Sequence, residues 1–198
     1  MIAALQANLS SKGYDPGPHD GVNGPLTMTA LCLFMARGQR AATCEACGRG
    51  LADFAGHYDL LRPLRLAHFM AQVSHESARF RYMEEIASGA AYEGRRDLGN
   101  TQPGDGQRYK GRGPLQLTGR ANYRAFGRAL GLPLESRPEI ASAPEIGIRI
   151  AMEYWRSRGL NTYADRDNIR AVTRRINGGY NGLADRQSEY ERARLVLR

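Results

Sequence analysis

LRLAHFMAQVSHESARF, residues 64 to 80, is the stretch of sequence that decides the fold. At about 100° per residue, its apolar side chains fall in one sector of a helix. This sector holds Leu66, Phe69, Met70, Val73, Ser77 and Phe80. The other side carries a polar strip of His68, Gln72, His75 and Arg79. The pattern predicts an amphipathic helix with its apolar face in a core and Glu76 at the edge of that face.

Glu76 has an unusual place for a carboxyl group, because it lies at the margin of an apolar stripe. Partial removal from water favours the neutral form of a carboxylic acid. A carboxyl group that keeps its proton near neutral pH can act as a general acid. The alternative is a structural glutamate at the core boundary, ion-paired with one of the many arginines of this chain.

A second carboxylate would complete a catalytic pair. Glu85 lies nine residues after Glu76, which on one continuous helix is about 900° and therefore the opposite face. Both can share a site only if the helix ends before Glu85, and the small residues of IASGAA (86–91) permit such a turn. Glu84 and Glu93 are further candidates, and spacing alone does not choose among them. Two carboxylates across a cleft are typical of glycoside hydrolysis.

Helical patterns cover most of the remaining sequence, and no convincing strand alternation occurs. Helices are predicted from residue 2 to beyond residue 9, and at 26–36, 51–82 with a turn near Pro63, 121–130, 143–158, 169–176 and 183–195. Residues 86–113 are rich in glycine and polar residues, which predicts a long loop of the kind that is often functional. The fold class is therefore mainly α.

The N-terminal part, residues 1–40, forms a unit of its own around the turn-rich GYDPGPHDGVNGP, residues 13–25. With Leu5 and Gln6 before it and Thr27 after it, this stretch resembles the first half of the peptidoglycan-binding domain family. The family's usual third segment is missing. The resemblance implies a wall-binding module, and the alternative is a helical hairpin that only packs on the main domain.

Composition limits the domain organisation and the partners. With 198 residues and 42% hydrophobic residues, we expect a linker at 41–50 and one main domain at 51–198. The net charge of +8, mostly arginine, indicates an anionic partner such as the acidic polymers of a bacterial wall or outer membrane. The arginines form no known nucleic-acid motif, so we expect no nucleic-acid partner. No run is apolar enough for membrane insertion, and residues 1–13 do not read as a signal peptide.

The cysteines are three in number, Cys32, Cys44 and Cys47, and an odd number does not make a disulfide framework. Cys44 and Cys47 form a CxxC, with His57 as the only further ligand type nearby. A closed zinc site needs four ligands, so we expect reduced thiols and no metal.

Several motifs together resemble glycoside hydrolase family 19, the family of chitinases and phage endolysins. They are AHFMAQVSHES (67–77), MEEI (83–86), YKGRGPLQLTGRANY (109–123), RINGGYNG (175–182) and ADR (184–186). The likeness covers residues 51–198, and the third block is the most specific. It implies a lysozyme-like, two-lobed α-helical domain with a catalytic cleft, preceded by the small N-terminal helical hairpin.

The resemblance also implies site residues. Glu76 matches the general acid, Glu85 the general base, and Thr118 the hydroxyl that helps to hold the attacking water. Glu93 is the alternative second carboxylate. Substrate-binding positions are His75, Tyr109, Gln116, Asn122, Tyr123, Asn177 and Arg186. One departure is Ala78 and Arg79, where relatives often carry two glycines.

The function implied is that of an endolysin of muramidase or lysozyme type, which hydrolyses β-1,4 bonds of peptidoglycan with inversion. Such a pair of carboxyl groups lies roughly 6.5–9.5 Å apart. The alternative is a chitinase that acts on N-acetylglucosamine polymers. We expect no metal or cofactor, a monomer, and a protein that stays in the host cytoplasm until its release to the periplasm and wall.

Overall fold

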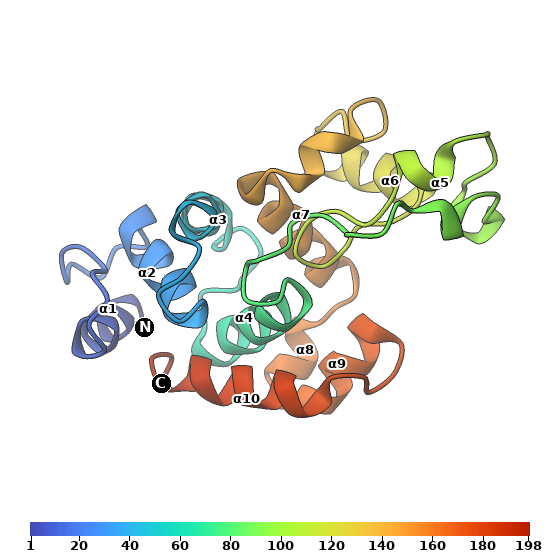
Figure 1. Cartoon of the computed structure of the whole chain (residues 1–198). Helices are drawn as coiled ribbons and strands as arrows, with labels where there is room; N and C mark the ends of the chain where they lie inside the picture. Colours follow the sequence, from blue (N-terminus) through green and yellow to red (C-terminus); the bar gives the residue numbers. More distant parts are fainter.

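Helices dominate the computed structural model, which describes all 198 residues (Figure 1). The α-helices are α1 (Ile2–Ser11), α2 (Pro25–Met35), α3 (Ala41–Phe54), α4 (Pro63–Glu76), α5 (Asp105–Arg108), α6 (Arg120–Leu130), α7 (Pro144–Ser157), α8 (Asn161–Ala164), α9 (Ile169–Asn177) and α10 (Leu183–Arg194). Short 3-10 helices are η1 (Ala90–Tyr92), η2 (Arg96–Leu98) and η3 (Pro138–Ser142). Extended pairing is limited to isolated bridges of Arg112 with Glu84 and with Leu117, so the mainly α prediction is confirmed. No helix combines the length and apolar character needed to cross a membrane.

Two apolar clusters divide the molecule into two lobes. The larger cluster has 34 buried residues drawn from both ends of the chain, and in it the rings of Phe69 and Trp155 meet edge to face at 5.5 Å. The smaller cluster holds seven: Tyr109, Leu117, Tyr123, Leu130, Leu134, Ala141 and Ile150. In Figure 1, α5 and α6 of the smaller lobe stand apart from α1 to α4. The expected two-lobed helical architecture is confirmed.

The central helix of the larger lobe is α4. Its predicted apolar face is fully buried at Leu66, Phe69, Met70 and Val73. On the other side, His68 and Gln72 are buried as well, because α9 and α10 pack against this helix, whereas His75 and Arg79 are partly exposed. His68 has no exposed surface, and its Nε2 lies 2.9 Å from Asp167 Oδ1. The helix therefore has an apolar and a polar interface, both inside the protein.

The segment at residues 41–50, expected to be a linker, is the first part of α3. The expectation is wrong because this segment is helical and its glycines are sites of close helix packing. A Cβ at Gly48 would lie 2.6 Å from the Thr29 backbone nitrogen of α2. One at Gly50 would lie 2.9 Å from the Glu145 carbonyl of α7. Helix α3 thus joins the N-terminal helices to the rest of the fold.

The three cysteines are free thiols buried in the larger core. Burial raises the pKa of Cys44 to about 12, and it raises the pKa of Cys47 further. No group of three or more His, Cys, Asp or Glu side chains converges to hold a metal ion. The CxxC is a pair of core residues one helical turn apart on α3.

The turn-rich stretch at residues 13–25 is folded by the residues that carry its resemblance. Gln6 Nε2, which is buried, donates to Asp20 Oδ1 at 3.0 Å and to Thr27 Oγ1 at 3.1 Å, and Gln6 Oε1 accepts from the Gly21 N–H at 2.9 Å. Thr27 Oγ1 donates to the Pro16 carbonyl at 3.0 Å. Helices α1 and α2 contribute to the same 34-residue core. The interpretation as a hairpin that packs on the main domain is confirmed, and wall binding by this unit stays a prediction.

Candidate active site

A tight chain reversal follows Glu76, the last residue of α4. Ala78, Arg79 and Phe80 all adopt left-handed backbone angles, with φ of 47°, 59° and 63°. Residues that carry a Cβ avoid this region at a cost of roughly 1–2 kcal/mol each. Two of these positions are those where relatives often have glycine, so the conformation explains that preference. The expectation that the helix ends before Glu85 is confirmed.

Side-chain contacts hold this strained turn. Ser77 Oγ accepts a hydrogen bond from the Phe80 N–H at 2.8 Å and donates to the Val73 carbonyl at 2.7 Å. Phe80 is fully buried and anchors the turn in the larger core. Arg79 Nε donates to Glu189 Oε1 at 2.9 Å, which ties the turn to α10. Arg79 thereby offsets part of the strain that its own backbone carries.

The carboxyl group of Glu76 is oriented by a buried arginine. Arg186 Nη2 donates to Glu76 Oε1 at 2.6 Å, and Arg186 Nη1 donates to Gln72 Oε1 at 2.5 Å. The Glu76 side chain keeps 22% of its surface exposed, whereas that of Arg186 keeps 1%. Glu76 is thus ion-paired at the core boundary, and its role as general acid stays a prediction. Arg186 was expected to bind substrate, and this is wrong, because its buried guanidinium instead positions Glu76.

Glu85 has both carboxylate oxygens held. Its Oε2 accepts from the Gly111 N–H at 2.9 Å and its Oε1 accepts from the Tyr92 hydroxyl at 3.1 Å. The Glu85 N–H donates to the Gly111 carbonyl at 2.9 Å, so the two backbones run side by side. Burial, and then the bond to Glu85, raise the pKa of Tyr92. The neighbouring Glu84 is paired with Arg112 at 3.1 Å, which leaves Glu85 as the carboxylate in a distinct polar setting.

The GPLQLT segment brings Gln116 next to Glu85. A Cβ on Gly111 would lie 3.0 Å from Glu85 Oε2 and 2.4 Å from Gln116 Oε1, so a larger residue would displace the end of the Gln116 side chain. Thr118 Oγ1 donates to the Gln116 carbonyl at 2.9 Å. Asn122, at the start of α6, donates to the Thr118 carbonyl at 2.7 Å. The segment is a tight turn held by its own polar side chains, with Gln116 beside Gly111 and Glu85, while their roles toward substrate stay predictions.

Tyr109 and Tyr123 are core residues of the smaller lobe. Each has at most 1% of its surface exposed, and their rings lie 5.3 Å apart. Tyr109 donates to the Glu135 carbonyl at 3.0 Å and Tyr123 to the Lys110 carbonyl at 2.8 Å. Burial raises the pKa of Tyr123 to about 12. The expectation that both bind substrate is wrong, because a side chain without accessible surface does not reach a ligand.

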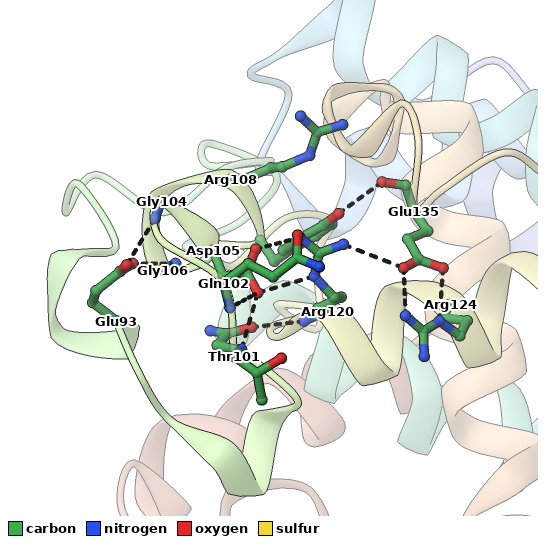
Figure 2. Close-up of polar contacts among 12 residues, drawn as sticks. Glu93, Thr101, Gln102, Gly104, Asp105, Gly106, Arg108, Arg120, Arg124 and Glu135 are labelled. Carbon is green, nitrogen blue, oxygen red and sulfur yellow. Dashed lines mark hydrogen bonds and ion pairs between the residues drawn. The ribbon is translucent and has the colours of Figure 1, made fainter.

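Glu93, the alternative second carboxylate, closes a loop (Figure 2). Its two oxygens accept hydrogen bonds from the Gly104 N–H at 2.7 Å and the Gly106 N–H at 2.8 Å. Both oxygens are therefore engaged by the backbone of the loop that begins beyond η2. Glu85 is likewise held by both oxygens, so Glu85 stays the predicted partner of Glu76 and Glu93 the alternative.

A network of charges that sequence reasoning missed fixes this loop on α6 (Figure 2). Asp105 Oδ2 accepts from the N–H groups of Thr101 and Gln102 at 3.1 and 3.0 Å, and from Arg120 Nε at 2.9 Å. The Arg120 guanidinium holds the pKa of Asp105 below its ordinary value, although burial opposes this. The only signal in the sequence was Asp105 three residues after Gln102, and this spacing was too weak to predict the network.

On the far side of Glu76, His75 contacts the N-terminal end of α10. His75 Nδ1 lies 2.6 Å from Asp185 Oδ2. Burial of Asp185 opposes ionisation, but the bond to His75 and the charge of Arg79 outweigh it and lower the pKa of Asp185. Asn177 is exposed at the end of α9, where Gly178 forms a left-handed cap with φ of 78°. Both predicted substrate positions are thus accessible, His75 in part.

Tyr154 on α7 is a neighbour of Glu76 that sequence reasoning missed. Burial raises the pKa of Tyr154, the charge of Arg158 opposes this, and the negative charge of Glu76 adds a smaller rise. Its hydroxyl donates to the Ile176 carbonyl near the end of α9 at 3.4 Å. The only signal was a tyrosine within the apolar pattern of the predicted helix at 143–158. Tyr154 connects the surroundings of Glu76 to the segment that holds Asn177.

Two glutamates, one at the end of a helix and one on the loop that follows it, in a two-lobed helical fold, are typical of a glycosidase. A sequence model of the family described as Chitinase class I matches residues 41–176, more than two thirds of the chain. The chain belongs to glycoside hydrolase family 19. The match begins at the first residue of α3, which agrees with the correction of the expected linker.

Relatives and solved structures agree with this assignment. The chain is 39% identical over 128 residues to Endochitinase At2g43610 of Arabidopsis thaliana, which covers 64% of this chain and 44% of that protein. It is 38% identical over 112 residues to a glycosyl hydrolase family 19 domain-containing protein of Haemophilus influenzae, covering 57% and 54%. Chitinase C from Streptomyces griseus has the same fold, with a TM-score of 0.69 at 24% identity, covering 85% of this chain and 91% of that one. The chain spans about half the length, or less, of these curated relatives.

Proposed function

We propose that this protein is an endolysin that hydrolyses the β-1,4-glycosidic bonds of bacterial peptidoglycan. The observation that carries the proposal is the contrast between two glutamates. Glu76 is held by one oxygen on Arg186, while its Oε2 has no partner in the protein. Glu85 is held by both oxygens, through the Gly111 N–H and the Tyr92 hydroxyl. Two carboxyl groups in different settings suit the two roles of acid and base.

In the proposed reaction, Glu76 protonates the glycosidic oxygen that leaves. Glu85 removes a proton from a water molecule held with Thr118, and that water attacks the anomeric carbon from the opposite face. Arg186 stabilises the Glu76 carboxylate that remains after proton transfer. This is an inverting mechanism, and a water fits between the carboxyl groups when they lie roughly 6.5–9.5 Å apart. Gln116, Asn122 and Asn177 are the polar side chains that we assign to sugar hydroxyl and acetamido groups.

Peptidoglycan is proposed as the substrate for two reasons. The turn at residues 13–25 resembles a peptidoglycan-binding module and packs on the catalytic fold. The net charge of +8 favours adsorption to anionic walls and outer membranes. We propose that a monomer acts in the periplasm and wall after release from the host cytoplasm.

A chitinase is the second candidate, because curated relatives of this chain are named endochitinases. Chitin and peptidoglycan share the β-1,4 linkage, but only peptidoglycan carries a lactyl group and peptides on alternate sugars. Measuring reducing ends released from purified sacculi and from colloidal chitin, at equal enzyme, separates the two. A rate on chitin that exceeds the rate on sacculi would overturn the endolysin proposal.

The direct test of the proposed function is mass spectrometry of sacculi digested by the purified protein. We expect muropeptides that end in a reducing N-acetylmuramic acid, from the wild type and not from Glu76→Gln or Glu85→Gln. Thermal unfolding of each variant checks that the fold is retained. An absence of released muropeptides, or undiminished cleavage by either variant, would contradict the proposed function.

A further inference from the structure

A hollow of about 670 Å³ lies along α9. Its lining comes from the first turn of the helix, from its last turn and from the segment that follows. Three arginines and two tyrosines dominate it: Arg170, Arg174, Arg175, Tyr163 and Tyr180. No aspartate or glutamate lines it, so three positive charges are unbalanced within the hollow.

The guanidinium groups of this hollow are free to bind a ligand. Arg170 lies over the Tyr180 ring at 4.7 Å and Arg175 lies over the Tyr163 ring at 4.3 Å. Stacking uses the flat face of a guanidinium and leaves its N–H edges available. Arg170, Arg174 and Arg175 form no ion pair and donate no side-chain hydrogen bond in the structure. The tyrosines orient two of the three cations without satisfying their donors.

The larger hollow beside α5 and α6, about 1050 Å³, is built differently (Figure 2). There Arg120 is paired with Asp105 and Arg124 with Glu135, while two further lining arginines, Arg108 and Arg128, have no carboxylate partner. On α9, Arg170 and Arg174 lie four positions apart on one helix face, and like charges at this spacing destabilise a helix. An anionic ligand would relieve that repulsion.

The hollow adjoins the surroundings of Glu76. Gly178 lines it and directly follows Asn177, the exposed residue that ends α9. Tyr180 lines it too, and the carbonyl of the next residue, Asn181, accepts a hydrogen bond at 3.3 Å from Arg186, the arginine that holds Glu76. A glycan bound against Glu76 therefore has this cationic hollow beside it.

We propose that the hollow binds the carboxylates of the peptides that peptidoglycan carries, and that it makes the protein prefer this acidic glycan over uncharged chitin. This inference rests on the proposed function and names the feature of the substrate that the protein selects. Guanidinium and carboxylate form paired, charge-assisted hydrogen bonds, and three arginines offer sites for more than one carboxylate. Chitin has no anionic group and gains nothing from them.

The test measures binding without turnover. Glu76→Gln protein is sedimented with intact sacculi and with glycan strands freed of peptides by an amidase. A triple variant, Arg170→Gln, Arg174→Gln and Arg175→Gln, is compared with a control triple, Arg96→Gln, Arg128→Gln and Arg198→Gln. The control removes the same charge from exposed arginines that have no carboxylate partner. The single variant Arg174→Gln repeats the measurement with the smallest disturbance, since its side chain contacts no charged or aromatic group.

We expect the α9 triple variant to bind intact sacculi about tenfold more weakly or worse, because each lost bond involves a charged group. Binding to peptide-free strands should equal that of the parent, and the control triple should stay within about threefold on both polymers. Equal weakening on both polymers, or equal weakening by the control, would overturn the proposal. Binding to phosphatidylglycerol vesicles is measured in parallel. If the α9 triple variant loses vesicle binding while its binding to sacculi is unchanged, the hollow binds lipid phosphates and the proposal is overturned.

Separate measurements distinguish failure of the proposed function from failure of the assignment of the hollow. If Glu76 and Glu85 do not cleave peptidoglycan, the wild type releases no reducing ends from sacculi, whatever the α9 variants bind. If cleavage occurs and only the hollow is misassigned, the α9 triple variant digests sacculi at the wild-type rate. Chitin oligosaccharide hydrolysis by the α9 triple variant should equal that of the wild type under the proposal.

Discussion

Arg186 Nη2 lies 2.6 Å from Glu76 Oε1, and the arginine is buried while the glutamate reaches solvent. The same guanidinium holds Gln72, one turn earlier on α4. Arg186 comes from α10, more than a hundred residues after Glu76. The position of the candidate acid is thus fixed by a long-range contact between two helices.

Arg186→Gln should lower kcat on the preferred glycan by about a hundredfold, since displacement of a reacting group by roughly 1 Å has that effect. KM should change little, because the buried side chain does not touch the sugar. Removal of one partner of a buried ion pair should also lower the free energy of unfolding by about 3–5 kcal/mol. Steady-state kinetics and chemical denaturation measure both, and an unchanged kcat would show that Arg186 has no positioning role.

Gly111→Ala should reduce activity more than stability. The new Cβ would lie 3.0 Å from Glu85 Oε2 and 2.4 Å from Gln116 Oε1, so one of these groups must move. We expect kcat/KM to fall by about tenfold or more. Gly24→Ala is the matched control, because no atom lies within 4 Å of its Cβ. Equal activity of the two variants would contradict the assigned position of Glu85.

Ala78→Gly should stabilise the protein by up to about 1 kcal/mol. The residue has φ of 47°, and relief of that strain exceeds the added freedom of glycine in the unfolded chain. Ala71→Gly, inside α4, is the control and should destabilise by about 1 kcal/mol or more. Thermal unfolding of both variants checks the sign, and a destabilised Ala78→Gly would show that the turn is unstrained.

Asp105→Asn should change the stability of the protein with pH. The folded-state pKa of Asp105 lies below its ordinary value, so its contribution is present above about pH 3.8 and is lost as pH falls through the folded value. The side chain is 2% exposed, and loss of its charged bonds should lower the free energy of unfolding at pH 7 by about 2–3 kcal/mol. Denaturation at pH 7 and at pH 3 should show a smaller difference between variant and wild type at the acid pH. A difference that does not shrink with acid would contradict the ion pair with Arg120.

The sequence was sufficient for the features set by local pattern. The helical spacing of the apolar residues predicted which face of α4 is buried. The nine-residue gap between Glu76 and Glu85 would put them on opposite faces of one helix, so the helix had to end between them for both to share a site. Both follow from geometry that is the same in every helix. The strained turn that achieves the reversal, at Ala78 and Arg79, was noticed only as a departure from glycine.

Other features depended on distant parts of the chain and could not be predicted. The segment at 41–50 was expected to be a linker, yet it is helical, and Thr29 of α2 packs against its Gly48. Tyr109 and Tyr123 lie in a specific motif, but burial, which no local pattern reveals, makes them core residues. The buried partners Gln72 and Arg186 meet only because α4 and α10 pack together.

The measurement that tests the central claim most directly is the anomer formed first, read by proton NMR within minutes of adding enzyme to soluble glycan strands of peptidoglycan. If Glu85 activates water across the bond that Glu76 protonates, the β-1,4 bond yields the α-anomer before mutarotation. A β-anomer as first product would mean that a carboxylate attacks the sugar, and it would contradict the roles assigned to Glu76 and Glu85.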